Sequence, residues 1–567
     1  MSARLPRRPA ERRGLRLWPV GTVLVLAFGT AFLAAWSVFY AGWELLGVRG
    51  LKPEHRIDSK TLFDLVKLAF GVVAGAGALV ALVVAYRRQR VDEDGALRDA
   101  TRLHTERFTT AVSQLGDESA AVRLGGVHAL AGLADDAPNR GLRQTCIDVL
   151  CAYLRLPYIA EADLPTDNAE ARHSYLALRE VRHTIVRLVR DHLRLPRDHH
   201  HSWQGHDFDF TSVVFDGGDF SESVFSGGTV HFTGSTFSGG TVRFDRSEFS
   251  GGTVHFNGSM FSGGTVHFNG SMFSGGTVHF NGSMFSGGTV HFYGSMFSGA
   301  VYFGESVFSG GSVHFDGSTF SSGSVHFGGS TFSGGSVHFT GSEFSAGSVH
   351  FTGSTFSAGT VYFTESVFSG GTVHLNGSMF SGGTVRFDRS DFSGGTVDCK
   401  WSTFSGGTVH LNESVFSGGK FSFDYSDFSG ATVHFDGSTF SDATVSFTGS
   451  TFSGGTVHFD GSEFSGGTVR FDGSELSGGS VHFILSEFAG SEVRFDASEF
   501  SGSEVQFDDS EFSGGTVRFD GSEFSGGTLD FGRSRGAAPH GLLPAAGSPL
   551  PHVLILPTAW QPTAPLL

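Results

Sequence analysis

Cysteine is scarce in this sequence: the 567 residues include three. So few thiols exclude a framework of disulfide bonds and fit a reducing compartment. Cys146 and Cys151 lie five residues apart on an expected helix and have no histidine partners. We therefore assign no zinc site to them and expect them to be buried core thiols.

Catalytic and cofactor-binding motifs are also missing. No Gly-x-x-x-x-Gly-Lys-Ser/Thr segment opens a helix, so we interpret the many Gly-Gly pairs as corners that need positive φ. Serine and histidine recur by repetition, without the oriented triad that nucleophilic catalysis needs. His199, His200 and His201 are neighbours in an expected linker and do not converge on a metal. We predict a protein that is not an enzyme, with no cofactor and no metal.

Positive charge is rare between residues 206 and 531, where 34 Asp and Glu accompany 9 Lys and Arg, a net charge of −25. The remainder of the chain carries +8 of the total of −17. An acidic segment of this kind repels phosphate groups, so free nucleic acid is excluded as a partner.

One 12-residue unit recurs from Phe225 to Phe524, typified by Phe-Ser-Gly-Gly-Thr-Val-His-Phe-Asn-Gly-Ser-Met. Most units hold a second Phe seven residues after the first. Because side chains alternate along a strand, Val and Phe of Val-His-Phe face one side and His the other. His fills that slot in 14 of 25 units and very different residues fill the others, which indicates an outward position. Rows of outward His spaced 24 residues apart, as at His231, His255 and His279, could bind metal or respond to pH, but we interpret them as polar residues that fill an exposed strand. The expected core includes Phe225, Phe232, Phe237, Phe244, Phe256, Phe387 and Phe524.

Steric considerations set the size of one coil. Twelve residues at roughly 3.3 Å each enclose a space too small for two Phe rings. We therefore expect two units, about 24 residues, per coil. Roughly 13 coils at a spacing of about 4.8 Å give a rod on the order of 60 Å long.

Ahead of the 12-residue units, Phe recurs every five residues, and a small or apolar residue stands two places before each of the last three. These residues are Phe210, Phe215, Phe220 and Phe225, with Val213, Gly218 and Ser223. The pattern resembles the pentapeptide-repeat family, and the resemblance covers Phe208 to Phe531. It implies a mainly β fold: a right-handed, four-sided β-helix with both positions inside.

The N-terminal region, residues 1–90, has two long apolar runs. Six Arg in residues 1–17 precede the uncharged run Val20–Phe39, and Arg87, Arg88 and Arg90 follow the run Leu68–Tyr86. We predict transmembrane helices at about 18–43 and 66–86, forming a hairpin with both termini in the cytoplasm. A cleaved signal peptide is the alternative, but its core would be shorter and would leave the second run unexplained. Small residues around Gly71 and Gly75 suit packing against the first helix or a second copy of the chain.

Three further regions follow. Apolar residues at helical spacing predict an α-helical domain over 91–202. Its segment Leu142–Tyr158 resembles a block found ahead of the repeats in membrane-anchored bacterial pentapeptide-repeat proteins. The solenoid is assigned to 203–531. Residues 532–567 are rich in Pro and Ala and are expected to be disordered, with Val553–Leu556 as a candidate cover for the open last coil.

These features predict a scaffold at the inner membrane, multi-pass, with a cytoplasmic solenoid that binds unknown protein partners. The alternative is an acidic mimic of DNA that acts on DNA gyrase or another DNA-binding protein, as the resemblance implies for some members. An exported ice- or surface-binding rod is a third, weaker possibility. On a 24-residue coil two columns of carboxylates form a candidate interaction surface, with help from Asp472, Asp496 and Asp520. The columns are Glu463, Glu487 and Glu511, and Glu475, Glu499 and Glu523.

Overall fold

The computed structural model describes most of the chain in two units, Met1–Glu106 and Arg107–Leu567. The described residues are 20–45, 58–161, 164–165, 168–539, 542 and 552–561. The predicted basic tail, residues 1–17, lies outside them.

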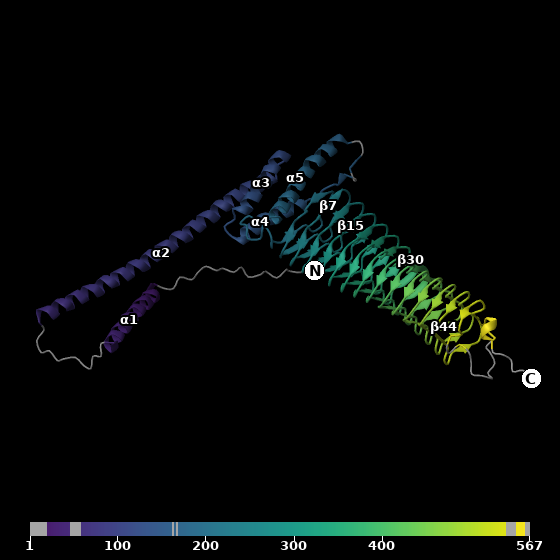
Figure 1. Ribbon diagram of the computed structural model, residues 1–567. Helices are drawn as coiled ribbons and strands as arrows, with labels where there is room; N and C mark the ends of the chain where they lie inside the picture. Colours follow the sequence, from purple (N-terminus) through teal and green to yellow (C-terminus); the bar gives the residue numbers. More distant parts are fainter. Residues whose placement is uncertain are drawn as a thin grey trace, which may run out of the picture. The chain divides into compact units, whose positions relative to one another are not determined.

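Helix α1 (Val20–Leu45) covers the first predicted span, and α2 (Ser59–Leu115) contains the second (Figure 1). Among the described residues, α2 is the one helix long and apolar enough to cross a membrane, and very little of its apolar stretch is buried. Length and composition thus allow one membrane-spanning helix, and the two-helix hairpin stays a prediction.

Helix α2 continues through residue 90, where we expected the first region to end. No proline interrupts it, and pairs of side chains three or four residues apart support its polar half. These pairs include Arg90 with Glu93 and Arg102 with Glu106. The helix ends at Leu115, before Gly116.

Three shorter helices follow: α3 (Ala120–Asp135), α4 (Arg140–Leu154) and α5 (Ala169–Leu193). Asn139 caps α4 by accepting a hydrogen bond from the Leu142 N–H. Their apolar faces share one core, and Cys146 and Cys151 are buried in it. Burial raises the pKa of the Cys146 thiol to about 11, so it is an inert core residue.

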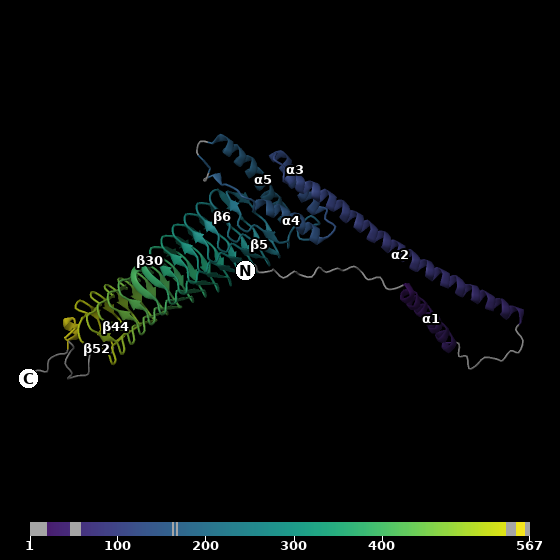
Figure 2. The ribbon, with the colours of Figure 1, turned by 180° about the vertical axis from the view of Figure 1, so that it is seen from behind.

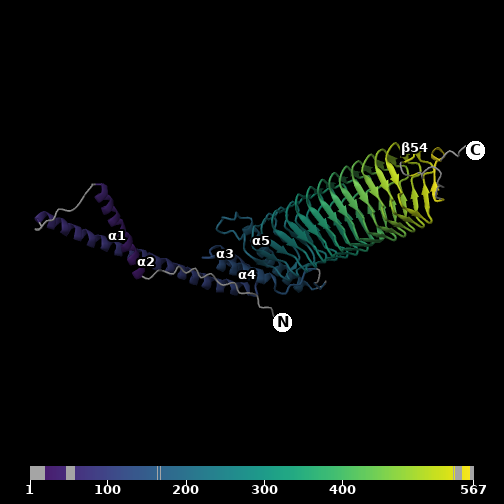
Figure 3. The same ribbon diagram turned by 90° about the horizontal axis from the view of Figure 1, so that it is seen from below.

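The solenoid coils contain about 24 residues, which confirms the predicted repeat. One coil consists of β9 (Thr253–His255), β10 (Met260–Phe261), β11 (Thr265–His267) and β12 (Met272–Phe273). Each strand pairs in parallel with the strand one coil later, so Val254 lies opposite Val278. Two sheets of 14 strands, one from each coil, give about 14 turns. The stacked coils are visible from three directions in Figures 1, 2 and 3.

A third sheet of 27 strands combines the β10-type and β11-type rows. The rows join at β30 (Met379–Arg386) and β33 (Thr403–His410), which continue across the corner that separates two strands in the other coils. The outward residues therefore form separate columns on the β9-type sheet, on the two rows of this large sheet, and on the β12-type sheet.

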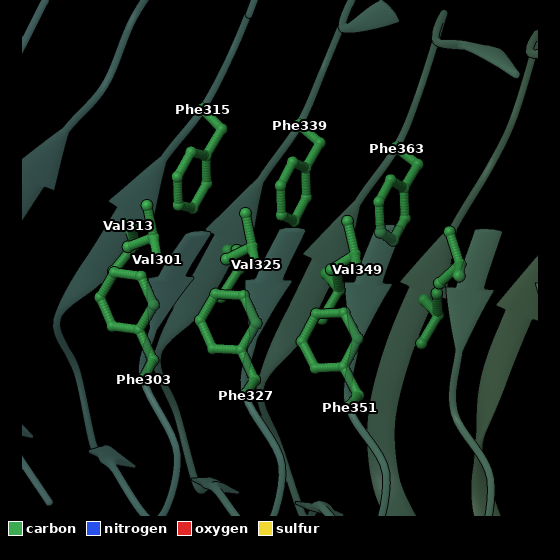
Figure 4. Close-up of a cluster of buried hydrophobic side chains, with 14 of the residues drawn as sticks. Val301, Phe303, Val313, Phe315, Val325, Phe327, Phe339, Val349, Phe351 and Phe363 are labelled. Atoms are coloured by element: carbon green, nitrogen blue, oxygen red, sulfur yellow. The ribbon is translucent and has the colours of Figure 1, made fainter. Parts of the chain in front are cut away.

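Phenylalanine and valine columns fill the interior (Figure 4). Phe303, Phe327 and Phe351 stack with ring centroids 4.9 and 4.8 Å apart, beside the column that contains Val325 and Val349. Of the predicted core residues, Phe524 is partly buried because it lies near the end of the stack, and the others are buried. Each buried ring contributes on the order of 1.5–3 kcal/mol to the stability of the rod.

Two columns of buried serines connect each coil to the coil before it. The Ser283 hydroxyl donates to the Phe256 carbonyl oxygen (2.8 Å) and accepts from the Ser259 N–H (3.2 Å). The same pair of bonds recurs along the rod, for example at Ser438 and Ser462. A polar residue is thereby tolerated in a dry interior, since its donor and acceptor are both paired.

One coil departs from the repeat in a compensated way. Leu411 occupies a Phe position between Phe387 and Phe435, while Phe421 occupies a position held by Val397 one coil earlier. The Phe421 ring lies 6.3 Å from both Phe387 and Phe435, edge-on to each. A larger residue in the valine column thus fills the space next to the smaller residue in the phenylalanine column.

A buried polar cluster connects the helices to the first coils. Asp216 accepts hydrogen bonds from Tyr158 and Tyr175 and lies 3.4 Å from His183. Burial would raise the pKa of this carboxyl, but the hydrogen bonds from His183, Tyr158 and Tyr175 lower it to about 2. Arg182 donates to the carbonyl oxygens of Leu154 and Val214. The helical domain and the first coil are therefore one packed body.

At the other end of the rod, the chain returns to cover the last coil. In place of the disorder expected after residue 531, β55 (Leu554–Ile555) pairs with β53 (Thr528–Asp530). Trp560 packs 5.6 Å from Phe512 and donates its indole N–H to the Gly536 carbonyl oxygen. Apolar residues between prolines suffice for this order because an unpaired strand edge and exposed rings are available to them.

Candidate interaction surfaces of the solenoid

The two predicted carboxylate columns exist as register neighbours. Glu463, Glu487 and Glu511 lie opposite one another on consecutive coils, and their side chains are exposed. The residues of the second column, Glu475, Glu499 and Glu523, are arranged in the same way.

The columns belong to different sheets. β42 (Glu463–Phe464) is in the β12-type sheet of 14 strands, whereas β44 (Glu475–Leu476) is in the 27-stranded sheet. Each column therefore gives its own narrow acidic strip. Any partner that binds both columns must contact two faces of the rod.

The aspartates expected to reinforce these columns are engaged by arginines. Arg494 lies 3.3 Å from Asp472 and 3.1 Å from Asp496, and Arg518 lies 2.6 Å from Asp520. Arg494 and Arg518 are register neighbours on the β9-type sheet, so they form a basic strip between acids. The faces of the C-terminal coils consequently differ in charge, and the net charge calculated from the sequence does not show this difference.

Near the N-terminal end of the rod, the surface is apolar. Met260, Met284 and Val307 form one outward column, and Met272 and Met296 form another on the β12-type sheet. Met284 is 46% exposed and Met296 is 53% exposed. Residues 249–304 include no Asp, Glu, Lys or Arg. Our sequence reading missed this surface; the signal was Met in an outward slot within an uncharged stretch.

Histidines form two further columns. On the β9-type sheet, His326, His350 and His374 stack with centroids 4.5 and 4.6 Å apart. Burial, then the neighbouring His326 and His374, lowers the pKa of His350 to about 4. Because burial and the neighbouring rings both disfavour its protonation, His350 is uncharged at neutral pH.

On the large sheet, three groups of His and Asp lie close enough to hold a metal ion. Each group offers two imidazole nitrogens and one carboxylate oxygen within 4.8 Å of one another. The groups are His314, Asp316 and His338; His434, Asp436 and His458; and His458, Asp460 and His482.

Comparison with known proteins agrees with this geometry. A family model described as pentapeptide repeats, in nine copies, matches residues 292–343. The comparisons with curated proteins and with solved structures give no match. Within the matched segment, Val301 and Phe303, then Ser306 and Phe308, have the inward pairs that recur every five or seven residues. With its parallel coils and buried small-x-Phe pairs, the chain belongs to the pentapeptide-repeat proteins.

Proposed function

We propose that this protein is a membrane-tethered, non-catalytic scaffold whose solenoid binds other proteins. The observation that carries the proposal is the exposed pair Met260 and Met284 on an uncharged part of the rod, in a column that continues to Val307. Exposed apolar patches on soluble domains mark interaction sites, and flexible methionine side chains adapt to partner surfaces.

The tether rests on the exposed apolar part of α2 and on the predicted first span in α1. In the proposed orientation both termini and the solenoid are cytoplasmic, because basic residues flank the spans on that side. Membrane fractionation and labelling of a Thr331→Cys variant with an impermeant maleimide on intact cells test it. Protection until the membrane is opened is expected, and labelling of intact cells would refute the orientation.

The binding surface is tested by replacing its methionines with a residue type that occurs naturally in the same columns. Thr occupies the same columns at Thr236, Thr319 and Thr331, so Met→Thr keeps the fold. Replacing Met260, Met272, Met284 and Met296 by Thr should remove partners captured from detergent-solubilised membranes. The matched control replaces Glu463, Glu487 and Glu511 by Gln and should retain them. Identical capture by both variants would exclude the methionine surface.

Mimicry of DNA is the second candidate function, and the in-register carboxylate columns favour it. It ranks below the scaffold because the columns lie on different sheets and Arg494 and Arg518 pair with neighbouring aspartates. Mimicry predicts that the full-length chain inhibits gyrase supercoiling and that inhibition weakens as salt rises. The Glu→Gln control above should abolish it, and the Met→Thr variant should not.

A further inference from the structure

The sequence Val-His-Phe-Asp occurs at 313–316, 433–436 and 457–460, and each time a second His follows 24 residues after the first. On a 24-residue coil this second His is the register neighbour of the first. The coil thus brings two imidazoles and one carboxylate together from adjacent turns.

The first group has the most complete surroundings. His314 Nδ1 lies 3.2 Å from Asp316 Oδ2, and the His314 and His338 rings stack 4.3 Å apart. The other carboxylate oxygen, Asp316 Oδ1, accepts the Thr340 N–H at 2.9 Å. One oxygen is therefore fixed by the backbone of the next coil, and the second is directed at the histidine.

Serine hydroxyls hold the far side of both rings. Ser312 Oγ lies 2.9 Å from His314 Nε2, and Ser336 Oγ lies 2.8 Å from His338 Nε2. When Nε2–H donates to serine, the Nδ1 lone pair of His314 faces a carboxylate lone pair. In that tautomer the two acceptors can bind one cation between them, whereas in the other tautomer Nδ1–H donates to Asp316 and no cation is needed. Hydrogen bonds of this kind at the second ring nitrogen orient histidine ligands in metal sites.

The spacing suits a transition-metal ion. Two ligand atoms about 2.0–2.1 Å from one tetrahedral ion are about 3.3 Å apart, close to the His314–Asp316 separation. The second imidazole nitrogen lies within 4.8 Å of the other two ligand atoms, so the His338 side chain must rotate to bring it to the ion. All three side chains are partly exposed, so water can complete the coordination.

We propose that His314, Asp316 and His338 bind one divalent transition-metal ion of the zinc type, bridging two consecutive coils. Imidazole and carboxylate together select such ions over calcium and magnesium. The residues from His434 to His482 provide a second site of the same kind. Its two groups share His458, so this site holds one ion.

The β9-type sheet supplies a matched control. His326, His350 and His374 stack at the same spacing, but the residues two places later are Gly328, Thr352 and Asn376, which offer no carboxylate. If stacked histidines alone bound metal, this column would bind as well.

Cobalt(II) is the probe, added to the full-length chain in detergent and followed by its visible absorption, with displacement by zinc(II). We expect two ions per chain. Asp316→Asn should remove one ion, and Asp436→Asn with Asp460→Asn should remove the other. His326→Ala with His350→Ala should leave both. Far-UV circular dichroism checks that each variant keeps the solenoid.

The double variant Ser312→Ala, Ser336→Ala distinguishes a metal site whose histidines are oriented by serine from adventitious binding of metal to surface histidines. Loss of these hydroxyls should weaken cobalt binding at the first site about 10- to 100-fold without changing the number of sites. Unchanged binding in the triple Asp→Asn variant would overturn the proposal. So would an equal loss in the His326→Ala, His350→Ala control.

Discussion

Phe421 is larger and Leu411 is smaller than the residue that the repeat has at each position. Whether the two compensate for each other can be tested by replacing Phe421 with Val and Leu411 with Phe. Phe421→Val alone removes a ring that contacts Phe392 at 4.7 Å and Phe416 at 5.0 Å, both edge-on. Leu411→Phe alone inserts a ring where Phe421 already fills the space. Made together, the two changes reproduce the packing of the other coils.

The magnitudes follow from core packing. Truncating a buried Phe to Ala costs about 3–5 kcal/mol, and Val keeps part of the side chain, so Phe421→Val should cost about 2–3 kcal/mol. Overpacking by Leu411→Phe should cost about 1–3 kcal/mol. The double variant should lie within about 1.5 kcal/mol of the natural chain, as expected for a swap that conserves volume. The two sites then have a favourable coupling energy of at least about 1.5 kcal/mol.

Urea unfolding of the full-length chain in detergent, followed by far-UV circular dichroism, measures the three variants. Hydrogen exchange in residues 385–445 locates the effect, since long repeat arrays need not unfold in one step. Additive losses, with the double variant as unstable as the sum of the single variants, would refute the compensation.

Three other perturbations have defined outcomes. Asp216→Ala leaves the hydroxyls of Tyr158 and Tyr175 without their acceptor and should destabilise the junction between the helices and the first coils by about 3 kcal/mol, measured by urea unfolding. Asp442 is exposed, so Asp442→Ala should leave the free energy of unfolding unchanged. The stability of the fold should fall as the pH is lowered from about 6.5 towards 4, because His350, with its pKa of about 4 in the folded state, binds fewer protons there than in the unfolded chain. His350→Gln should flatten the pH dependence of the melting temperature. An unchanged pH dependence in this variant would contradict the lowered pKa of His350. Trp560→Ala should loosen the terminal cover and increase concentration-dependent association by light scattering, while Gln561→Ala should not.

The periodic part of the fold was predictable because one short pattern repeats. The spacing of Phe225, Phe232 and Phe237 set the inward positions, and the volume of two rings set the length of the coil. The family resemblance added the small residue two places before Phe, which the structure places inside at Ser235 and Ser247.

Features that depend on two distant positions escaped the sequence reading. The tail was expected to be disordered apart from Val553–Leu556, the candidate cover, which the pairing of Leu554 with Leu529 confirms; the packing of Trp560 on Phe512 was not predicted. The Arg494 pairs and the His314–Asp316–His338 group join residues 22 to 24 positions apart and emerge only when the coil length is applied to outward residues. The sequence reading also did not predict that one helix, α2, continues across the boundary assigned at residue 90, because charged residues continue a helix as well as apolar ones do.

The serine columns give the rod a polarity. Every hydroxyl in them except that of Ser223 bonds to the coil before it, so the serines of each coil are satisfied by the coil that precedes it. Ser223, near the start of one column, has no coil before it, and among the described residues its hydroxyl is buried without a hydrogen-bond partner. The first coil instead rests on the helical domain through Asp216 and Arg182. The helical domain therefore supplies the surface on which the first coil packs, and each later coil supplies that surface for the next.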